Sequence, residues 1–149
     1  MAVTIVTNGP CPPLQLKALW DLIPWAQGRD PESIERTIQA TELMVLAWDE
    51  DRLVGSTRVI TDGVYYATIW DVIVHPDYRG QGVGYRMVEA AVDPFRHRGF
   101  SYIALYSVVG VEPFYERLGF RRHPAGMRLD ESITPLPPGI EDGTAPEGG

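Results

Sequence analysis

The sequence is poor in cysteine and has no long apolar run. Cys11 is the only cysteine among 149 residues, which excludes an internal disulfide and any metal site built from several cysteines. No window approaches the roughly 18 consecutive apolar residues of a membrane span. The segment from Met1 to Thr7 lacks the basic region and apolar stretch of a signal peptide. We therefore expect a cytoplasmic protein with no metal and no membrane partner.

Basic blocks are also missing, and the negative charge gathers near the C-terminus. The formal net charge is −7, and residues 130–149 carry five acidic side chains and no basic one. The remaining 15 acids and 13 bases give a net charge of −2, so we expect no nucleic-acid partner. Residues 130–149 are rich in Pro and Gly and poor in apolar residues, which predicts a disordered tail after a single folded domain, residues 1–129.

The hydrophobic pattern predicts alternating helices and strands. Helices are expected at residues 14–25, 31–41, 83–98 and 112–118, and strands at 3–7, 43–48, 53–60, 65–74, 102–106 and from Phe120 onward. Asp30 before Pro31 is typical of a helix N-cap. Pro94 is expected to kink or shorten its helix. The order of elements indicates an antiparallel meander followed by a strand–helix–strand crossover, that is, a mixed α/β (α+β) sheet covered by helices.

A glycine-rich segment, residues 79–84, lies between a predicted strand and a predicted helix. It reads Arg-Gly-Gln-Gly-Val-Gly. Glycines allow a phosphate to approach the backbone closely, and the free N–H groups and dipole of a helix N-terminus favour its negative charge. The segment therefore predicts either a phosphate-binding loop or a plain tight turn.

The glycine spacing separates three kinds of phosphate site. A dinucleotide fingerprint, Gly-x-Gly-x-x-Gly, would need a third glycine where the chain has Tyr85 or Met87. A P-loop needs Gly-Lys-Ser/Thr, which is absent. The acyl-CoA loop, Arg/Gln-x-x-Gly-x-Gly/Ala, is matched by Arg79, Gly82 and Gly84 without a gap. The spacing favours acyl-CoA.

A second, distant segment supports this interpretation. Residues 112–120, Glu-Pro-Phe-Tyr-Glu-Arg-Leu-Gly-Phe, together with residues 71–84 resemble the GCN5-related N-acetyltransferase (GNAT) superfamily over roughly residues 14–122. Residues 67–74, Ala-Thr-Ile-Trp-Asp-Val-Ile-Val, preceded by Thr-Asp-Gly at 61–63, resemble more closely a group of cyanobacterial proteins and plant chloroplast enzymes. Enzymes of that group acetylate arylalkylamines such as serotonin, and also protein lysines.

The resemblance implies a fold and a cofactor site. It implies a mostly antiparallel sheet of six to seven strands flanked by about four helices, with the fourth and fifth strands splayed around acetyl-CoA. Backbone groups of Val72, Ile73 and Val74 would hold the pantetheine arm. The pyrophosphate would be held by Arg79, Gly80, Gln81, Gly82, Val83 and Gly84, with Tyr85 adjacent.

The resemblance also implies catalytic roles. Tyr115 matches the tyrosine that protonates the departing CoA thiolate, and a phenol with a pKa near 10 holds its proton at neutral pH. Asp71 is the candidate base, or it binds the ammonium group, or it is a buried structural carboxylate. Trp70 is either a contact for an aromatic substrate, with Trp20 or Trp25 nearby, or a core residue.

The sequence does not identify the acceptor of the acetyl group. Some relatives carry Asn or Asp after the fifth strand, where this chain offers only Ser107, so the substrate is less well defined than the cofactor. The resemblance implies transfer of an acetyl group to a primary amine such as serotonin. The alternatives are a protein lysine or N-terminus as acceptor, or a non-catalytic acyl-CoA-binding domain. We expect a monomer or homodimer.

Overall fold

The computed structural model describes residues 2–127, and these form two compact units whose boundary lies between Leu105 and Tyr106. The predicted acidic tail, residues 130–149, lies outside the described residues, as does the predicted end of the folded domain at residue 129.

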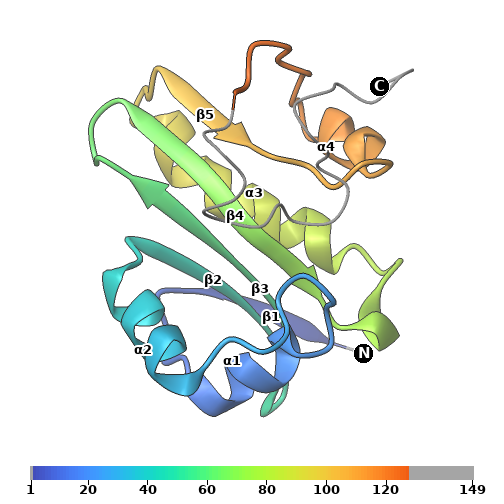
Figure 1. Cartoon of the computed structure of the whole chain (residues 1–149). Helices are drawn as coiled ribbons and strands as arrows, with labels where there is room; N and C mark the ends of the chain where they lie inside the picture. Colours follow the sequence, from blue (N-terminus) through green and yellow to red (C-terminus); the bar gives the residue numbers. More distant parts are fainter. Residues whose placement is uncertain (1, 128–149) are drawn as a thin grey trace. The chain divides into compact units, whose positions relative to one another are not determined.

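The first unit is built on a five-stranded sheet. The strands, in spatial as well as chain order, are β1 (Val3–Thr7), β2 (Leu43–Asp49), β3 (Arg52–Thr61), β4 (Tyr66–Val74) and β5 (Tyr102–Leu105). All neighbours pair antiparallel except β4 and β5, which are parallel. This confirms the mixed, mostly antiparallel sheet with a crossover between its last two strands (Figure 1).

The predicted count of six to seven strands was too high for the described residues, which form five. The strand expected from Phe120 onward is not formed: residues 120–123 have no regular secondary structure. Phe120 is followed by the exposed Arg121, Arg122 and His123, so the segment has one apolar residue and no alternating apolar face that could pack on a core.

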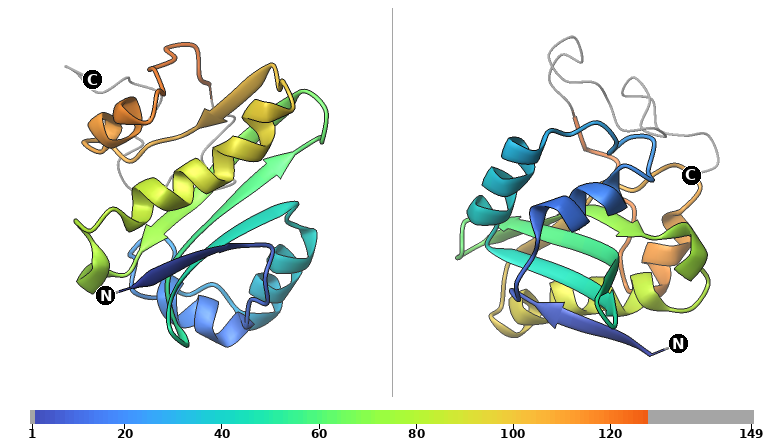
Figure 2. Two further views of the ribbon diagram at one scale, coloured as in Figure 1. Left: turned by 180° about the vertical axis from the view of Figure 1, so that it is seen from behind. Right: turned by 90° about the horizontal axis from the view of Figure 1, so that it is seen from below.

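Helices cover both faces of the sheet. The pair α1 (Pro13–Trp20) and α2 (Pro31–Ala40) lies on one face, and α3 (Val83–His97) lies on the other (Figure 2). With α4 (Glu112–Arg117) in the second unit, the expected number of about four helices is confirmed. The predicted N-cap is confirmed as well, because Asp30 accepts a hydrogen bond from the Ser33 N–H at 2.9 Å.

Two helix boundaries differ from the sequence prediction. The first helix ends at Trp20 rather than near residue 25, and the chain then continues in turns to residue 28. The third helix is not shortened by Pro94 and continues to His97. Pro94 lies in the last turns, where few helical bonds follow it, and Val92 and Phe95 on either side of it are buried. Burial of that face therefore outweighs the lost backbone bond.

The core between α1, α2 and the sheet is centred on Trp20, whose side chain is 2% exposed. Its indole N–H donates to the Ser56 hydroxyl at 3.0 Å, so the buried polar atom is satisfied. On the other face, a Cβ added to Gly55 would lie 2.8 Å from the Met87 sulfur and 3.1 Å from the Ala47 Cβ, so a larger residue there would require the Met87 side chain on α3 to shift. No helix within residues 2–127 is long and apolar enough to cross a membrane.

Candidate functional site

The glycine loop, residues 79–84, lies between β4 and α3. After Val74 the chain makes a short 3₁₀ helix, Pro76–Tyr78, and then the loop leads into α3 at Val83 (Figure 1). Gly80 and Gly82 have φ angles of 75° and 80°, in the left-handed region that favours glycine. A Cβ at either position would meet nothing within 4 Å. The backbone conformation therefore requires glycine here, and the space beside the loop is open.

The first turn of α3 is not capped by a side chain. The first helical bond runs from the Arg86 N–H to the Gly82 carbonyl at 3.1 Å, and no acidic residue lies in the first turn. The N–H groups of residues 83–85 precede that bond and are free to donate to an anion, which the helix dipole also favours. A pyrophosphate fits this helix end both sterically and electrostatically.

A β-bulge interrupts β4 beside this loop. Asp71 and Val72 together lie opposite Thr57, because the register of the β3–β4 ladder shifts between Ser56 and Arg58. Asp71 has a φ of 51°, which is uncommon for a residue other than glycine. Bulges of this kind re-aim side chains, and here the bulge directs the carboxylate of Asp71 towards two arginines.

The far half of β4 continues beyond its neighbour β5. The parallel ladder pairs residues 66–69 with residues 102–105 and ends there. Within the first unit, residues 70–74 therefore have no strand partner on the β5 side. The candidate pantetheine-binding residues, Val72, Ile73 and Val74, all lie in this half, where backbone groups are left for other partners.

Asp71 is held in a buried ion pair with two arginines. Its carboxylate accepts from Arg29 Nη1 at 3.0 Å and Nη2 at 3.3 Å, and from Arg58 Nε at 2.9 Å, and its side chain is 7% exposed. Burial alone would raise the pKa of Asp71, but the hydrogen bonds and charges of Arg29 and Arg58 outweigh it and hold the pKa below its ordinary value. This pairing favours the structural alternative for Asp71 over the base or the ammonium-binding group.

The tryptophans have different surroundings. Trp70 lies opposite Arg58 in the β3–β4 ladder, is half-buried, and donates its indole N–H to the Thr68 hydroxyl at 2.9 Å. Trp20 is enclosed in the core, and the guanidinium of Arg29 lies 4.6 Å from the centre of its ring. Trp25 packs against the same core. Of Trp20, Trp25 and Trp70, the last is the one on the candidate catalytic strand.

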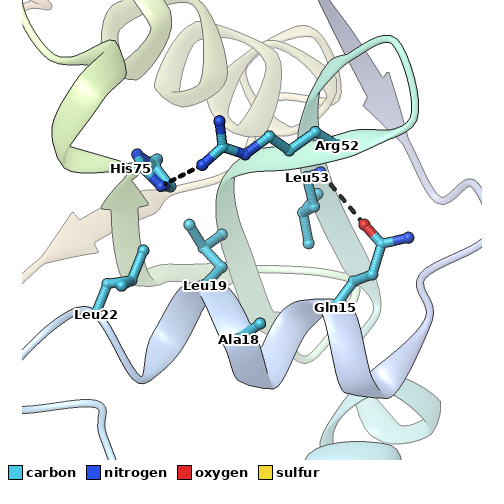
Figure 3. Close-up of a pocket in the computed structure, with 7 residues that line it drawn as sticks. All are labelled: Gln15, Ala18, Leu19, Leu22, Arg52, Leu53 and His75. Carbon is cyan, nitrogen blue, oxygen red and sulfur yellow. Dashed lines mark hydrogen bonds between the residues drawn. The ribbon is translucent and has the colours of Figure 1, made fainter.

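A small groove of about 270 Å³ runs between α1 and the start of β3 (Figure 3). Its polar groups bond to one another: the Gln15 side-chain oxygen accepts from the Leu53 N–H at 3.4 Å, and Arg52 Nη2 lies 2.9 Å from His75 Nε2. These contacts tie the β2–β3 turn to the end of β4. They give the groove a structural role.

Tyr115 lies on α4 in the second unit. Its ring makes edge-on contacts with Phe114 and Phe120, with centroid distances of 4.9 and 6.1 Å. Burial raises the pKa of Tyr115 to about 12, so the phenol keeps its proton throughout the neutral range. Ser107, in the same unit, donates its hydroxyl to the carbonyl of Val108 at 2.8 Å. A protonated phenol in apolar surroundings suits a proton donor.

Residues 12–120 match the model of the Acetyltransferase (GNAT) family. The chain belongs to this family. Over 79 residues it is 40% identical to GCN5-related N-acetyltransferase 2, chloroplastic, of Arabidopsis thaliana, a match covering 53% of this chain and 31% of that protein. Over 107 residues it is 36% identical to Serotonin N-acetyltransferase 2, chloroplastic, of Oryza sativa subsp. japonica, covering 67% and 52%. The chain thus spans about a third to a half of these two relatives.

Among solved structures, this GNAT chain is similar to a probable acetyltransferase of meticillin-resistant Staphylococcus aureus. The TM-score is 0.75 at 24% identity, covering 87% of this chain and 99% of that one. At this identity the likeness shows the fold alone, and it confirms the GNAT-like architecture that the sequence predicted.

Sequence reasoning missed Arg29 and Arg58, the two partners of Asp71. A weak signal for Arg58 was present, because it is the one charged residue inside the predicted strand 53–60. Nothing in the sequence marks Arg29, which reaches Asp71 across 42 positions of the chain. The pairing depends on how α1, the following turn and β4 pack in three dimensions.

Proposed function

We propose that the chain transfers an acetyl group from acetyl-CoA to a primary amine. The observation that carries the proposal is the uncapped N-terminus of α3 behind the two left-handed glycines, Gly80 and Gly82. The residues proposed to hold the cofactor are Arg79, Gly80, Gln81, Gly82, Val83, Gly84 and the exposed Tyr85 at the pyrophosphate, with Val72, Ile73 and Val74 along the pantetheine arm. When bound, acetyl-CoA supplies the acetyl group as a thioester that an unprotonated amine attacks, with release of the CoA thiol.

Tyr115 is proposed as the general acid. Its raised pKa keeps the proton on the phenol across the neutral range, and the hydroxyl is proposed to donate it to the CoA sulfur as the bond to the acetyl carbon breaks, after which the phenolate regains a proton from solvent. Asp71 is proposed to position the segment between α1 and α2 through its ion pair with Arg29, because its lowered pKa makes it a weak proton acceptor. The proton lost by the amine is then passed to solvent, and the rate should rise with pH as the free amine becomes more abundant.

For the acceptor, an arylalkylamine such as serotonin is the first candidate. The name of the rice relative supports it, as do the aromatic rings on one edge of the sheet, where Tyr66 and Tyr102 meet edge-on with centroids 6.4 Å apart. Trp70 lies two residues beyond Thr68 on the same strand and offers a further ring. A protein lysine or N-terminus is the alternative acceptor.

A cytoplasmic location for the protein stays a prediction from its sequence.

An amine panel tests the proposal. CoA release from acetyl-CoA would be followed with a thiol-trapping reagent in the presence of serotonin, tryptamine, polyamines, a lysine peptide or free amino acids. We expect release above background with at least one primary amine. A protein that gains thermal stability from CoA yet releases no CoA with any amine would instead be a non-catalytic acyl-CoA-binding domain.

Gly82→Ala should raise the KM for acetyl-CoA by roughly tenfold, because a left-handed alanine costs about 1–2 kcal/mol and the loop can relax away from its phosphate-binding shape. Gly63→Ala is the matched control: Gly63 also has a φ of 80°, and a Cβ there also meets nothing within 4 Å. We expect similar losses of stability in both variants, measured by urea unfolding, with the change in KM confined to Gly82→Ala. An equal KM in the two variants would contradict a phosphate site at this loop.

A further inference from the structure

A second groove, of about 480 Å³, lies between α2 and the end of β3. The side chains that matter for its chemistry are those of Arg36, Arg58, Ser33, Thr37, Thr41 and Ile60. It is lined by two arginines and three hydroxyl residues and by no acidic side chain. A positively charged lining of this kind favours an anion.

Arg58 is oriented into this groove by Asp71. Its Nε donates to the Asp71 carboxylate at 2.9 Å, and this is the one hydrogen bond that the Arg58 side chain makes within residues 2–127. The two terminal nitrogens of the guanidinium therefore keep their donors, although the side chain is only 20% exposed. A guanidinium fixed at one nitrogen, with two others free, presents a pre-oriented fork to a carboxylate or phosphate.

Arg36 supplies a second guanidinium from α2. It is exposed, and no described side chain or carbonyl pairs with it. The hydroxyls of Ser33 and Thr41 already donate on their own helix, to Asp30 and to the Thr37 carbonyl. The donors left in the groove are thus mainly those of the two arginines, one on α2 and one on β3.

The groove adjoins the strand that carries the proposed reaction. Arg58 lies opposite Trp70 in the β3–β4 ladder and contacts Asp71 at the bulge. We propose that this groove binds an oxyanion, a carboxylate or a phosphate group, carried by the amine acceptor at some distance from its amine. This assignment rests on the proposed function in that it takes the occupant to be the acceptor, and it predicts that acid-bearing amines bind better than their neutral counterparts.

The test compares matched ligands on the full chain saturated with CoA, so that the phosphate-binding loop is occupied. The ligands are γ-aminobutyrate, its amide, and aminopropylphosphonate, with binding measured by isothermal titration calorimetry at low salt. We expect either acid to bind roughly tenfold more tightly than the amide, as for one charge-assisted pair. A preference for the carboxylate or for the phosphonate distinguishes the two sources of the oxyanion.

Arg36→Gln and Arg58→Gln should each abolish the preference for acid over amide without weakening the amide. Arg36→Gln is the cleaner variant, since Arg36 makes no contact that folding needs, whereas Arg58→Gln also removes a partner of Asp71. Arg96→Gln is the control, because Arg96 is 60% exposed on α3 on the other face of the sheet. Equal binding of acid and amide to the unmodified chain, or a preference that survives Arg36→Gln, would overturn the proposal.

CoA release measured with the same ligands separates this inference from the proposed function. Acid-selective binding without CoA release would support oxyanion binding in the groove and would count against acetyl transfer. CoA release with no difference between acid and amide would support acetyl transfer and remove the groove from acceptor recognition.

Discussion

Replacing Tyr115 by Phe should lower kcat by roughly a hundredfold or more, the contribution of a positioned general acid. The variant keeps the ring that packs against Phe114 and Phe120, and the Tyr115 hydroxyl makes no hydrogen bond with any described residue, so folding should be almost unchanged. The KM for acetyl-CoA should also stay close to that of the unmodified chain. Steady-state CoA release and thermal unfolding measure the two effects separately.

The matched control is Tyr65→Phe, which removes the hydroxyl of an exposed tyrosine on the first unit. The pH profile gives a second check. An acid works in its protonated form, and the pKa of Tyr115 is about 12, so its loss of the proton should produce no fall in kcat between about pH 7 and 10. Full activity of Tyr115→Phe would exclude this tyrosine as the proton donor.

Replacing Asp71 by Asn should destabilise the fold by about 1–3 kcal/mol and disturb the segment that links α1 to α2. The variant leaves Arg29 and Arg58 without their anion, but these side chains are 34% and 20% exposed, so water offsets part of the loss. Asn tolerates the φ of 51° at this position. The substitution therefore removes charge without adding backbone strain, and urea unfolding measures the result.

The stability difference should depend on pH in a defined direction. Because the pKa of Asp71 is lowered in the folded protein, its contribution is fully present above the ordinary aspartate pKa and is lost as pH falls through the folded value. The gap between the unmodified chain and Asp71→Asn should thus be constant near neutrality and shrink below about pH 4. A gap that stays constant into strong acid would contradict the ion pair.

Arg29→Gln distinguishes a positioning role for Asp71 from a role as base. If Asp71 positions the α1–α2 segment, Arg29→Gln and Asp71→Asn should change KM and kcat in the same direction. If Asp71 is the base, the same change removes its main cationic partner, raises its pKa and should preserve or increase activity. We expect the first outcome.

Local features were predictable where the physical cause is itself local. The N-cap at Asp30 needs only a side-chain oxygen three residues before an N–H, and the strands from Leu43 to Val74 follow from their own apolar patterns. Predictions failed where packing decides. The first helix ends at Trp20, whose indole N–H donates to Ser56 in the core, and the segment after Phe120 forms no strand within the described residues.

The sequence by itself determined the family, the glycine loop and the tyrosine of α4, because each depends on residue types at short, regular spacing. Only the tertiary structure decided what Asp71 contacts. Its partners, Arg29 and Arg58, lie 42 and 13 positions away, and a bulge with a left-handed backbone turns the carboxylate towards them. The spacing of these residues along the chain does not predict their ion pairs, because the packing of the sheet and helices brings the charges together.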